Sequence, residues 1–284
     1  MKDKKDATEC PFCGYRVGTP AEAPQLEPGT ILLDRYLIGK ALNQNGEGVS
    51  YISYDITQRK TIEIREFLPS SLCERELGQA NVTVKAELKE VYRDYLADFL
   101  ETARALVRLK EVASIVPVLD IFELNKTAYV VYRHYEGVTL FEAISHNKNS
   151  RIPWNDAAKI FKPVVSSIVA AHAIGLMHFG LSPHTILLTS DGSLKITGFG
   201  IPEAYLHETE IDAEPIDGFA AIEQYSIDGR KGKWTDVYGL SATLFFMVTG
   251  LTPPDAIKRS YDPSLNIPKD LAMSLPTHMV TAMA

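Results

Sequence analysis

The charged residues Glu63 and Arg65 have the spacing that points most clearly to chemistry. Both lie in the segment 61–65, where polar and apolar residues alternate. Side chains two positions apart on a β-strand point to the same face of a sheet. A carboxylate on a buried face is costly to desolvate unless it is paired. The pattern therefore predicts that these residues pair with each other or with neighbours; the alternative is two polar side chains that face solvent on an edge strand.

Cys10 and Cys13 form a second pair with informative spacing, in a Cys-Pro-Phe-Cys-Gly stretch. Structural zinc takes four ligands, often thiolates, so this knuckle supplies two of them. Two chains that share one ion would complete the site; the alternative is a knuckle that binds no metal. Cys73 lies in a different context, and three cysteines in 284 residues indicate a reducing compartment rather than a disulfide scaffold.

The segment 201–218 is acidic and contains no lysine or arginine. Its carboxylates are Glu203, Glu208, Glu210, Asp212, Glu214 and Asp217. Tyr205 and Thr209 carry its only hydroxyl groups. A permanently negative loop predicts a docking surface for a basic protein partner; the alternative is an acidic loop that contacts only solvent.

Composition restricts the class of protein. The chain has 284 residues, of which 45% are hydrophobic and 23% charged, and a formal net charge of −7. These values are ordinary for a globular protein, and nucleic-acid binding would need clustered cations. Five of the first six residues are charged, and no apolar run is long enough to span a membrane. We expect no nucleic-acid partner, no signal peptide and no membrane span in this chain.

The chain must position these residues on two kinds of structure. From residue 30 to residue 132 the pattern is β-rich, with one amphipathic helix at 95–109; the predicted strands are 51–54, 61–65, 116–122 and 128–132. The later part is helical, with helices at 156–174 and 235–249. The helix 235–249 is apolar on nearly all sides, which predicts burial, and Gly250 is expected to end it.

The order of these segments and of several motifs resembles the protein kinase fold over residues 34–284. The motifs are a loop at 42–51, the strand with Glu63 and Arg65, the helix at 95–109, a hinge near Tyr132, the stretch 178–188 and Gly198-Phe199-Gly200. Bacterial serine/threonine kinases that begin with a Cys-Pro-x-Cys-Gly knuckle are similar. The resemblance implies an α+β, two-lobed fold. The implied domain organisation of the chain is a mostly flexible knuckle and linker at 1–29, a β-rich N-lobe at 30–132 and a helical, truncated C-lobe at 133–284.

In the kinase pattern, the stretch 178–188 is the catalytic loop, and here the reacting positions hold other residues. The resemblance implies that Gly180 replaces the catalytic base, Ser182 a phosphate-facing lysine and Thr185 a metal-binding asparagine. Gly198 replaces the main Mg²⁺ ligand. Since positioning and charge neutralisation by Mg²⁺ supply most of this chemistry, the degenerate positions predict that the chain is not an enzyme. The resemblance also implies that Asp236 braces the loop backbone and that His178 is a core residue.

The nucleotide-facing positions depart from the pattern as well. Arg65 aligns with the lysine that binds phosphates, and Thr102 with the glutamate that pairs with that lysine. Glu63 stands where the family has a small residue against adenine, so we expect it to fill the empty nucleotide cleft. Only the last of three loop glycines is kept, and Glu47 is expected at the loop tip. The cleft positions are Asn43, Asn45, Gly48, Ser50, Glu63, Tyr132 and Leu187.

These observations predict a pseudokinase that acts as a protein-binding, scaffolding or allosteric regulatory module in bacterial signalling. Its expected partner is a protein, either basic or an active kinase. No cofactor is expected: ATP and Mg²⁺ should not bind, and zinc at Cys10 and Cys13 is the one candidate metal. The alternatives are a nucleotide-binding sensor and a divergent serine/threonine kinase with weak ATP-dependent phosphotransfer. A cytoplasmic location is expected, as part of a longer, membrane-anchored protein if the native chain continues past Ala284.

Overall fold

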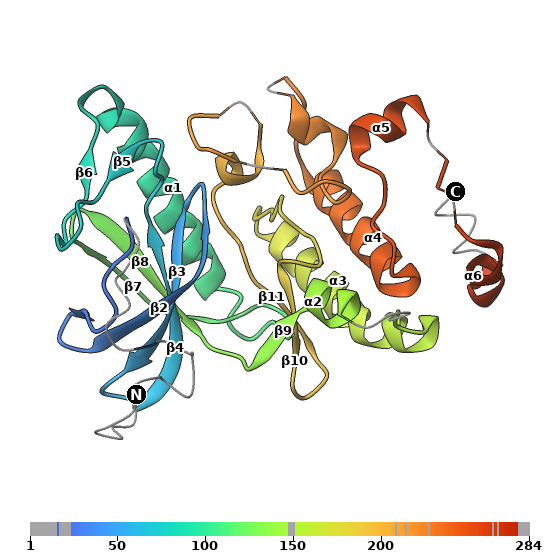
Figure 1. Cartoon of the computed structure of the whole chain (residues 1–284), viewed down its shortest axis with the longest axis horizontal. Coiled ribbons are helices and arrows are strands. Elements are labelled where there is room, and N and C mark those ends of the chain that lie inside the picture. Colours follow the sequence, from blue (N-terminus) through green and yellow to red (C-terminus); the bar gives the residue numbers. More distant parts are fainter. Residues whose placement is uncertain are drawn as a thin grey trace. The chain divides into compact units, whose positions relative to one another are not determined.

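The computed structural model describes Arg16 and residues 24–277 apart from 147–150, 208, 214, 227, 263 and 266. The described residues form two compact units (Figure 1). The first unit takes its residues from Met1–Arg108, Pro117–His134 and Glu210–Ala213, and the second from Leu109–Val116, Tyr135–Thr209 and Glu214–Ala284. Each unit therefore combines segments that are separated in the sequence.

The first unit is built on a six-stranded antiparallel sheet with the strand order β1-β2-β3-β4-β8-β7. Its strands are β1 (Ile31–Leu32), β2 (Tyr36–Asn45), β3 (Gly48–Asp55), β4 (Lys60–Phe67), β7 (Val118–Leu124) and β8 (Thr127–Arg133). Arg65 of β4 lies opposite Ser50 of β3 and Val130 of β8. β4 is thus a central strand, which rules out the alternative that Glu63 and Arg65 lie on an edge strand.

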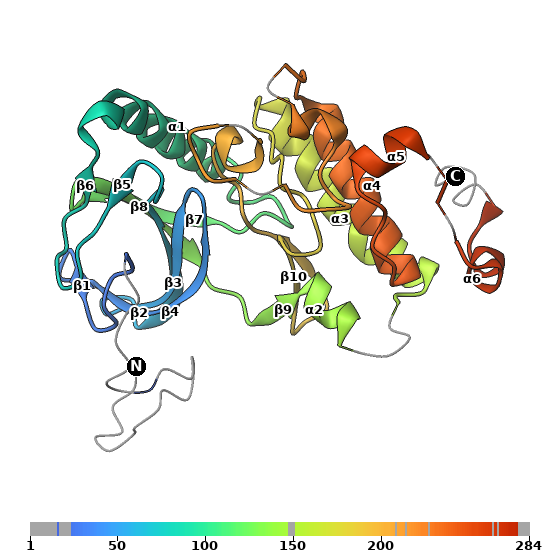
Figure 2. The same cartoon turned by 45° about the horizontal axis from the view of Figure 1, so that its top comes forward.

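One long helix, α1 (Lys89–Val107), packs on β7 and β8 of this sheet (Figure 2). It follows a short 3₁₀ helix, η1 (Ala86–Leu88), and the two-stranded hairpin of β5 (Cys73–Glu74) and β6 (Thr83–Val84). α1 begins earlier than the predicted Tyr95, because Tyr92 is buried and continues the apolar face of the helix.

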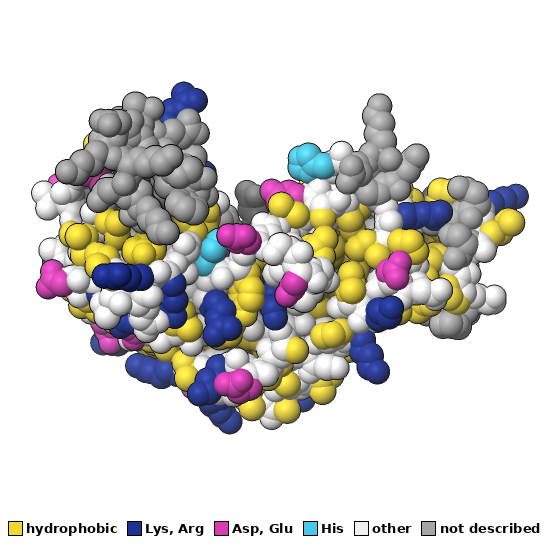
Figure 3. Space-filling view, turned by 90° about the horizontal axis from the view of Figure 1, so that it is seen from below, with side chains coloured by type: hydrophobic (Ala, Val, Ile, Leu, Met, Phe, Trp, Pro, Cys, Tyr) yellow, Lys and Arg dark blue, Asp and Glu magenta, His cyan; other side chains and the backbone are white. Residues whose placement is uncertain are grey.

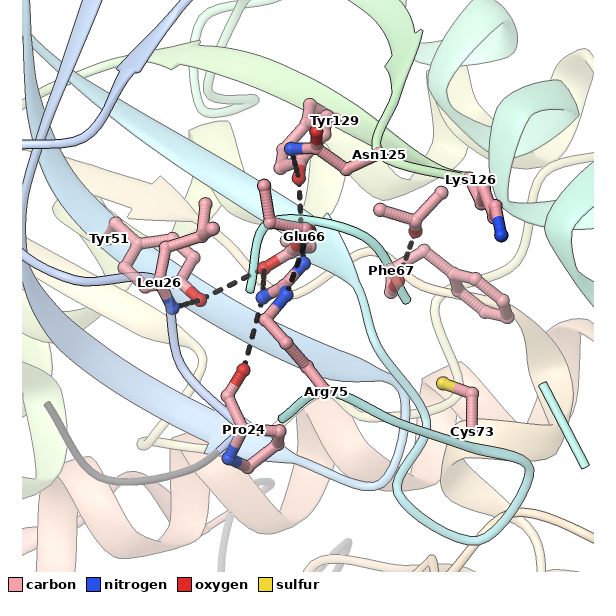
Figure 4. A network of polar contacts seen from close by, with 12 residues as sticks. Pro24, Leu26, Tyr51, Glu66, Phe67, Cys73, Arg75, Asn125, Lys126 and Tyr129 are labelled. Atoms are coloured by element: carbon pink, nitrogen blue, oxygen red, sulfur yellow. Dashed lines mark hydrogen bonds and ion pairs between the residues drawn. The ribbon is translucent and has the colours of Figure 1, made fainter. Parts of the chain in front are cut away.

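A buried carboxylate, Glu66, organises the face of the sheet opposite to Arg65 (Figure 4). Glu66 accepts hydrogen bonds from the hydroxyl groups of Tyr51, at 2.9 Å, and Tyr129, at 2.7 Å. It also forms an ion pair with Arg75. Since burial alone would make this charge costly, the three partners explain why it is tolerated in the interior.

The same network holds the start of the continuously described chain (Figure 4). Arg75 Nη1 donates to the carbonyl oxygen of Pro24 at 3.0 Å, and the backbone N–H of Leu26 donates to Tyr51 Oη at 3.0 Å. The Leu26 side chain is buried. Packing on the sheet therefore starts before residue 30, the predicted start of the N-lobe.

The second unit is mainly helical, with a three-stranded sheet in the order β11-β10-β9. Its elements are β9 (Gly137–Thr139), α2 (Leu140–Ser145), α3 (Trp154–Ala173), β10 (Ile186–Thr189), β11 (Leu194–Ile196), η2 (Pro202–Tyr205), η3 (Ile222–Tyr225), α4 (Lys233–Thr249), α5 (Ala256–Tyr261) and α6 (Lys269–Ser274). α3 and α4 pack side by side (Figures 1 and 2).

The buried character predicted for the helix 235–249 is confirmed. The side chains of Phe245, Phe246, Met247 and Val248 in α4 are buried. The helix ends at Gly250, whose left-handed φ of 70° lets its N–H donate to Phe246 O. A β-rich unit with one long helix and a helical unit with a small sheet confirm the predicted α+β class. Among the described residues, no helix is long and apolar enough to cross a membrane.

Candidate functional site

Arg65 is buried on β4 in the first unit, with 8% of its surface exposed. Its guanidinium contacts three side chains from the neighbouring β2–β3 hairpin. Nη2 and Nε lie 2.6 and 2.7 Å from Glu47 Oε2. Nη2 also donates to Asn45 Oδ1 at 2.6 Å, and Nη1 donates to Ser50 Oγ at 3.1 Å. Glu47 is fully buried, so each charge is the other's main compensation for lost water.

The turn between β2 and β3 directs Glu47 toward Arg65. Asn45 Oδ1 accepts hydrogen bonds from the backbone N–H groups of Glu47 and Gly48, both at 3.2 Å, which closes the turn. A Cβ atom at Gly48 would overlap the carbonyl oxygen of Glu66, so only glycine allows this approach to β4. Glu47 lies at the tip of this hairpin, as predicted, between Asn45 at the end of β2 and Gly48 at the start of β3, and the tight turn folds its side chain inward onto Arg65.

Glu63 has a different partner from Arg65. Its Oε1 lies 2.7 Å from His134 Nδ1, and both side chains are 25% exposed. Glu63 and Arg65 do not pair with each other, because side chains two apart on a strand are separated by about 7 Å along it and each has a nearer partner. The predicted pairing with neighbours is confirmed. Glu63 lies opposite Tyr132 of β8 in the register.

The other positions that sequence analysis singled out are dispersed over both units. In the first unit Asn43 is exposed on β2, and Thr102 of α1 and Tyr132 of β8 are partly exposed. The carboxylate that meets Arg65 thus comes from the β2–β3 turn and not from α1. Leu187 lies on β10 of the second unit, opposite Thr139 and Lys195.

The loop 178–185 of the second unit is braced from α4. Asp236 accepts hydrogen bonds from the backbone N–H groups of His178, at 2.9 Å, and Phe179, at 2.7 Å, and its Oδ2 lies 2.7 Å from His172 Nε2. His178 is fully buried, and its Nε2 lies 2.8 Å from the Thr197 carbonyl oxygen. Burial lowers the pKa of His178, so its imidazole is neutral and donates from Nε2. The predicted bracing by Asp236 and the core role of His178 are confirmed.

Hydroxyl groups hold this loop at the positions of the lost lysine and asparagine. Thr185 Oγ1 donates to the Gly180 carbonyl oxygen at 2.8 Å and accepts from the Ser182 N–H at 3.1 Å. Ser182 Oγ accepts from the His184 N–H at 3.3 Å. The imidazole of His184 stacks on Phe141 with ring centroids 4.1 Å apart. These side chains shape the backbone of the loop.

The side chain of Tyr205 occupies the space beside Gly180. A Cβ atom at Gly180 would lie 2.6 Å from Cδ1 and 2.7 Å from Cζ of this ring. The hydroxyl group of Tyr205 donates to the carbonyl oxygen of Gly198. The ring therefore fills the space that a side chain at position 180 would need. This role of Tyr205 was not predicted from the sequence. The two glycines at positions 180 and 198 do indicate that two side chains are missing, so that another group must fill their space.

Resident Mg²⁺ does not fit the side chains of this loop. Magnesium prefers oxygen ligands that include carboxylates, and neither Thr185 nor Gly198 carries one. The Thr185 hydroxyl and the Gly198 carbonyl oxygen already have partners within the loop and in Tyr205.

Nowhere in the described part of the chain do three or more His, Cys, Asp or Glu side chains gather as a metal site. Cys10 and Cys13 lie outside the described residues, so zinc binding there stays a prediction.

The acidic segment is only partly described, because Glu208 and Glu214 lie outside the described residues. Glu210 belongs to the first unit and accepts a hydrogen bond from Tyr95 Oη of α1. This hydrogen bond lowers the pKa of Glu210. The face in Figure 3 carries basic and acidic side chains interspersed over its described residues. A basic partner of the acidic segment stays a prediction.

Comparison with known proteins gives consistent matches. The family described as protein kinase domain matches residues 71–278. The probable serine/threonine-protein kinase PknB of Lactococcus lactis is 27% identical over 81% of this chain and 34% of its own length. PrkC of Bacillus subtilis, a serine/threonine-protein kinase, is 32% identical over 50% of this chain and 22% of its own. The chain thus spans about a third or less of these relatives' length.

Solved structures match over nearly the whole chain. The structure titled "PpkA-294 apo form" has a TM-score of 0.72 and 26% identity, over 91% of both chains. The PknI kinase domain of Mycobacterium tuberculosis has a TM-score of 0.60 and 19% identity, over 90% of this chain and 86% of that chain. The second likeness supports the fold alone. Together they confirm the predicted kinase-like fold, with its β-rich N-lobe and helical C-lobe.

These matches contradict the prediction that the chain is not an enzyme. The relatives are named serine/threonine protein kinases, and the solved neighbours include a kinase domain. That prediction rests on the residues at positions 65, 102, 180, 182, 185 and 198. Such positions show only which side chains are present at individual places in the sequence. The match over residues 71–278 extends over the whole domain, and it is the domain that these kinases share.

Proposed function

Because the chain belongs to the protein kinase family, as its match over residues 71–278 establishes, we propose that it is a regulatory, protein-binding domain of serine/threonine kinase signalling. Its partner is a protein, either an active kinase or a basic protein that meets the acidic segment 201–218. The exposed carboxylates among the described residues of this segment are Glu210, Asp212 and Asp217.

The observation that carries this proposal is the occupied guanidinium of Arg65. The family lysine at this position binds nucleotide phosphates, whereas Arg65 here binds Glu47, Asn45 and Ser50 within its own unit. A phosphate group would have to displace Glu47, and separating a buried pair costs about 3–5 kcal/mol when one charge is left unpaired. Because the group that would bind phosphate instead holds the domain's own hairpin, binding of a protein at the surface is favoured over binding of a nucleotide.

A second candidate function, ATP-dependent phosphotransfer to serine or threonine, is favoured by the names of the relatives. It would proceed without carboxylates at positions 180 and 198, because both are glycine. The charge that develops on the transferred phosphoryl group would then need other cationic or dipolar groups for its stabilisation.

Two assays on the purified chain separate the candidates. In the first, radiolabelled ATP and Mg²⁺ are supplied with serine- and threonine-containing peptides. In the second, the chain is added at equimolar amount to an active serine/threonine kinase domain, and the rate of that kinase is measured. The regulatory function predicts a changed rate in the second assay, whether or not the chain labels the peptides in the first. Label transferred by the chain, with no effect on the added kinase, supports phosphotransfer instead.

Substitutions connect the second assay to the proposed surface. Replacing Glu210 and Asp212 by Gln and Asn removes charge from the acidic segment, and we expect this to weaken the effect on the added kinase. Replacing the exposed Glu101 of α1 by Gln is the matched control, because it removes a carboxylate of the same unit outside that segment. Equal losses in both variants would contradict a role for the segment 201–218.

A further inference from the structure

We propose that the loop 178–185, together with Gly198, forms a binding site for a neutral phenol group, and that Tyr205 is its internal occupant. The site lies within the second unit. It does not depend on the proposed regulatory function, because it concerns only what this loop can bind.

The shape of the site comes from a missing side chain. Gly180 leaves a face of bare backbone, and the Tyr205 ring lies so close that a methyl group at position 180 would be 2.6–2.7 Å from two ring carbons. Real Cβ atoms do not approach other carbons that closely, so the ring and a side chain at position 180 exclude each other. The loss of a side chain at this position is therefore a condition for the aromatic occupant.

The polar end of the site is a backbone carbonyl group. The Gly198 carbonyl oxygen accepts the Tyr205 hydroxyl hydrogen bond. Gly198 has a φ of 78°, a left-handed conformation that other residues adopt only with strain. A Cβ atom there would lie 3.0 Å from Thr185 Cγ2 and 3.4 Å from Tyr205 Oη. Glycine at position 198 thus serves both the backbone conformation and the space around the hydroxyl group.

Gln224 fixes the walls of the site. Its side chain is buried, and its Nε2 donates to the carbonyl oxygens of Phe179, at 2.8 Å, and Tyr205, at 3.1 Å. Its Oε1 accepts from the Ala221 N–H at 2.8 Å. Gln224 thereby ties the loop to the end of η2, the short helix that carries Tyr205. The site keeps its loop wall when the Tyr205 side chain is removed, because the bonds to Phe179 and Ala221 do not involve that side chain.

The chemistry of the lining selects a neutral phenol. A pocket continues beside the ring, and its described lining includes the apolar residues Leu181, Ile216 and Phe219 but no lysine or arginine. A phosphorylated tyrosine would bring its charge to the Gly198 carbonyl oxygen, an acceptor that repels it, with no cation of this lining to compensate. The site should therefore bind tyrosine and reject phosphotyrosine.

Removal of the internal occupant tests the site directly. In the Tyr205→Ala variant of the full chain, 10 mM para-cresol, an order-of-magnitude choice for a ligand of this size, should raise the melting temperature by about 2–4 °C. Toluene, which lacks the hydroxyl group, should raise it less, and para-cresyl phosphate should not raise it. The wild-type chain should not respond, because Tyr205 occupies the site. No response of Tyr205→Ala, or an equal response of the wild-type chain, would overturn the proposal.

A second comparison keeps the proposal testable if Tyr205→Ala folds poorly. Gly180→Ala should lower the melting temperature of the wild-type chain, because the new methyl group meets the ring. The loss of melting temperature that Gly180→Ala causes should become smaller as the side chain at position 205 shrinks, from Tyr205→Phe to Tyr205→Leu to Tyr205→Ala. Gly180→Ala in the Tyr205→Ala background should also abolish the para-cresol response. A Gly180→Ala effect that is the same in all backgrounds would contradict the site.

Discussion

The hairpin around Arg65 and the loop around Gly180 respond to altered kinase positions in opposite ways. In the first region a charge is retained, and Glu47, Asn45 and Ser50 of the adjoining hairpin satisfy it. In the second region charge is lost, and the Tyr205 ring fills the space. A retained charge must be paired where it lies, whereas a deleted side chain leaves volume that any well-shaped group can take.

The two regions should therefore differ in how they fail. A change in the charged region leaves a buried ion without its partner, which is among the most damaging single changes. A change in the ring-filled region alters packing and backbone strain, which are smaller terms and depend on how far neighbours can move.

The largest effect is expected from Arg65→Met, which leaves Glu47 buried without its cation. We expect a loss of about 3–5 kcal/mol in the free energy of unfolding, measured by urea denaturation. The double variant Arg65→Met/Glu47→Leu should recover much of that loss, because no charge is left behind. Arg93→Met is the control: its pair with Asp94 has side chains 73% and 70% exposed, and such pairs contribute little. Equal losses of unfolding free energy in Arg65→Met and Arg93→Met would contradict the view that the buried charge of the first region depends on its partner.

Gly198→Ala sharpens the comparison in the ring-filled region. The left-handed φ of 78° alone costs a non-glycine residue about 1–2 kcal/mol. The new methyl group would also lie 3.0 Å from Thr185 Cγ2, which adds to that cost. Gly192→Ala is a matched control, since Gly192 has a φ of 80° and no atom within 4 Å of its Cβ position. The difference in melting temperature between the two variants measures the packing of the Tyr205 site, and no difference would argue against it.

The pH dependence of stability tests the brace beneath the loop. Because burial lowers the pKa of His178 in the folded chain, the unfolded chain binds this proton more readily. Stability should be fully present above about pH 6.5 and should fall as the pH drops below it, by at most about 1.4 kcal/mol per pH unit. Denaturation between pH 7.5 and pH 5.5 measures this slope, which His178→Asn should flatten. His207→Asn, at an exposed histidine of the same unit, should leave the slope unchanged.

The smallest effect is expected from Glu63→Ala. Glu63 and His134 form a pair with side chains 25% exposed, and exposed or half-exposed pairs contribute about 0–1 kcal/mol. The melting temperature should change by a degree or two at most. A loss of stability as large as that of Arg65→Met would mean that Glu63, and not Glu47, is the carboxylate that stabilises this region, in line with its predicted cleft-filling role.

Periodicity was sufficient to predict the elements that position the sites. The burial of Leu240 and Phe245 in α4 and the apolar face of α1 at Phe99 and Ala103 follow from apolar residues that recur at helical spacing. The N-terminal limit of α1 was missed because Tyr92 is amphipathic, and its burial is decided by packing against the sheet rather than by its type.

Partner choice at the sites was beyond the sequence pattern. Which carboxylate meets Arg65 depends on a turn that Asn45 and Gly48 close, and a one-residue change in that turn would aim Glu47 elsewhere. Tyr205 reaches Gly180 from a short 3₁₀ helix that is distant in the sequence, so no local periodicity links them. Only the joint loss of side chains at Gly180 and Gly198 signals that another residue must fill the space.

A thermal-shift titration with ATP, with and without Mg²⁺, tests the central claim that Arg65 is committed to Glu47. A nucleotide at about 100 times its Kd adds about 2.7 kcal/mol of stability, which is a shift of several degrees. We expect no Mg²⁺-dependent shift for the wild-type chain, and a Mg²⁺-independent shift for Glu47→Gln, in which the guanidinium loses the negative charge beside it. A Mg²⁺-dependent shift of the wild-type chain would contradict the claim and favour phosphotransfer.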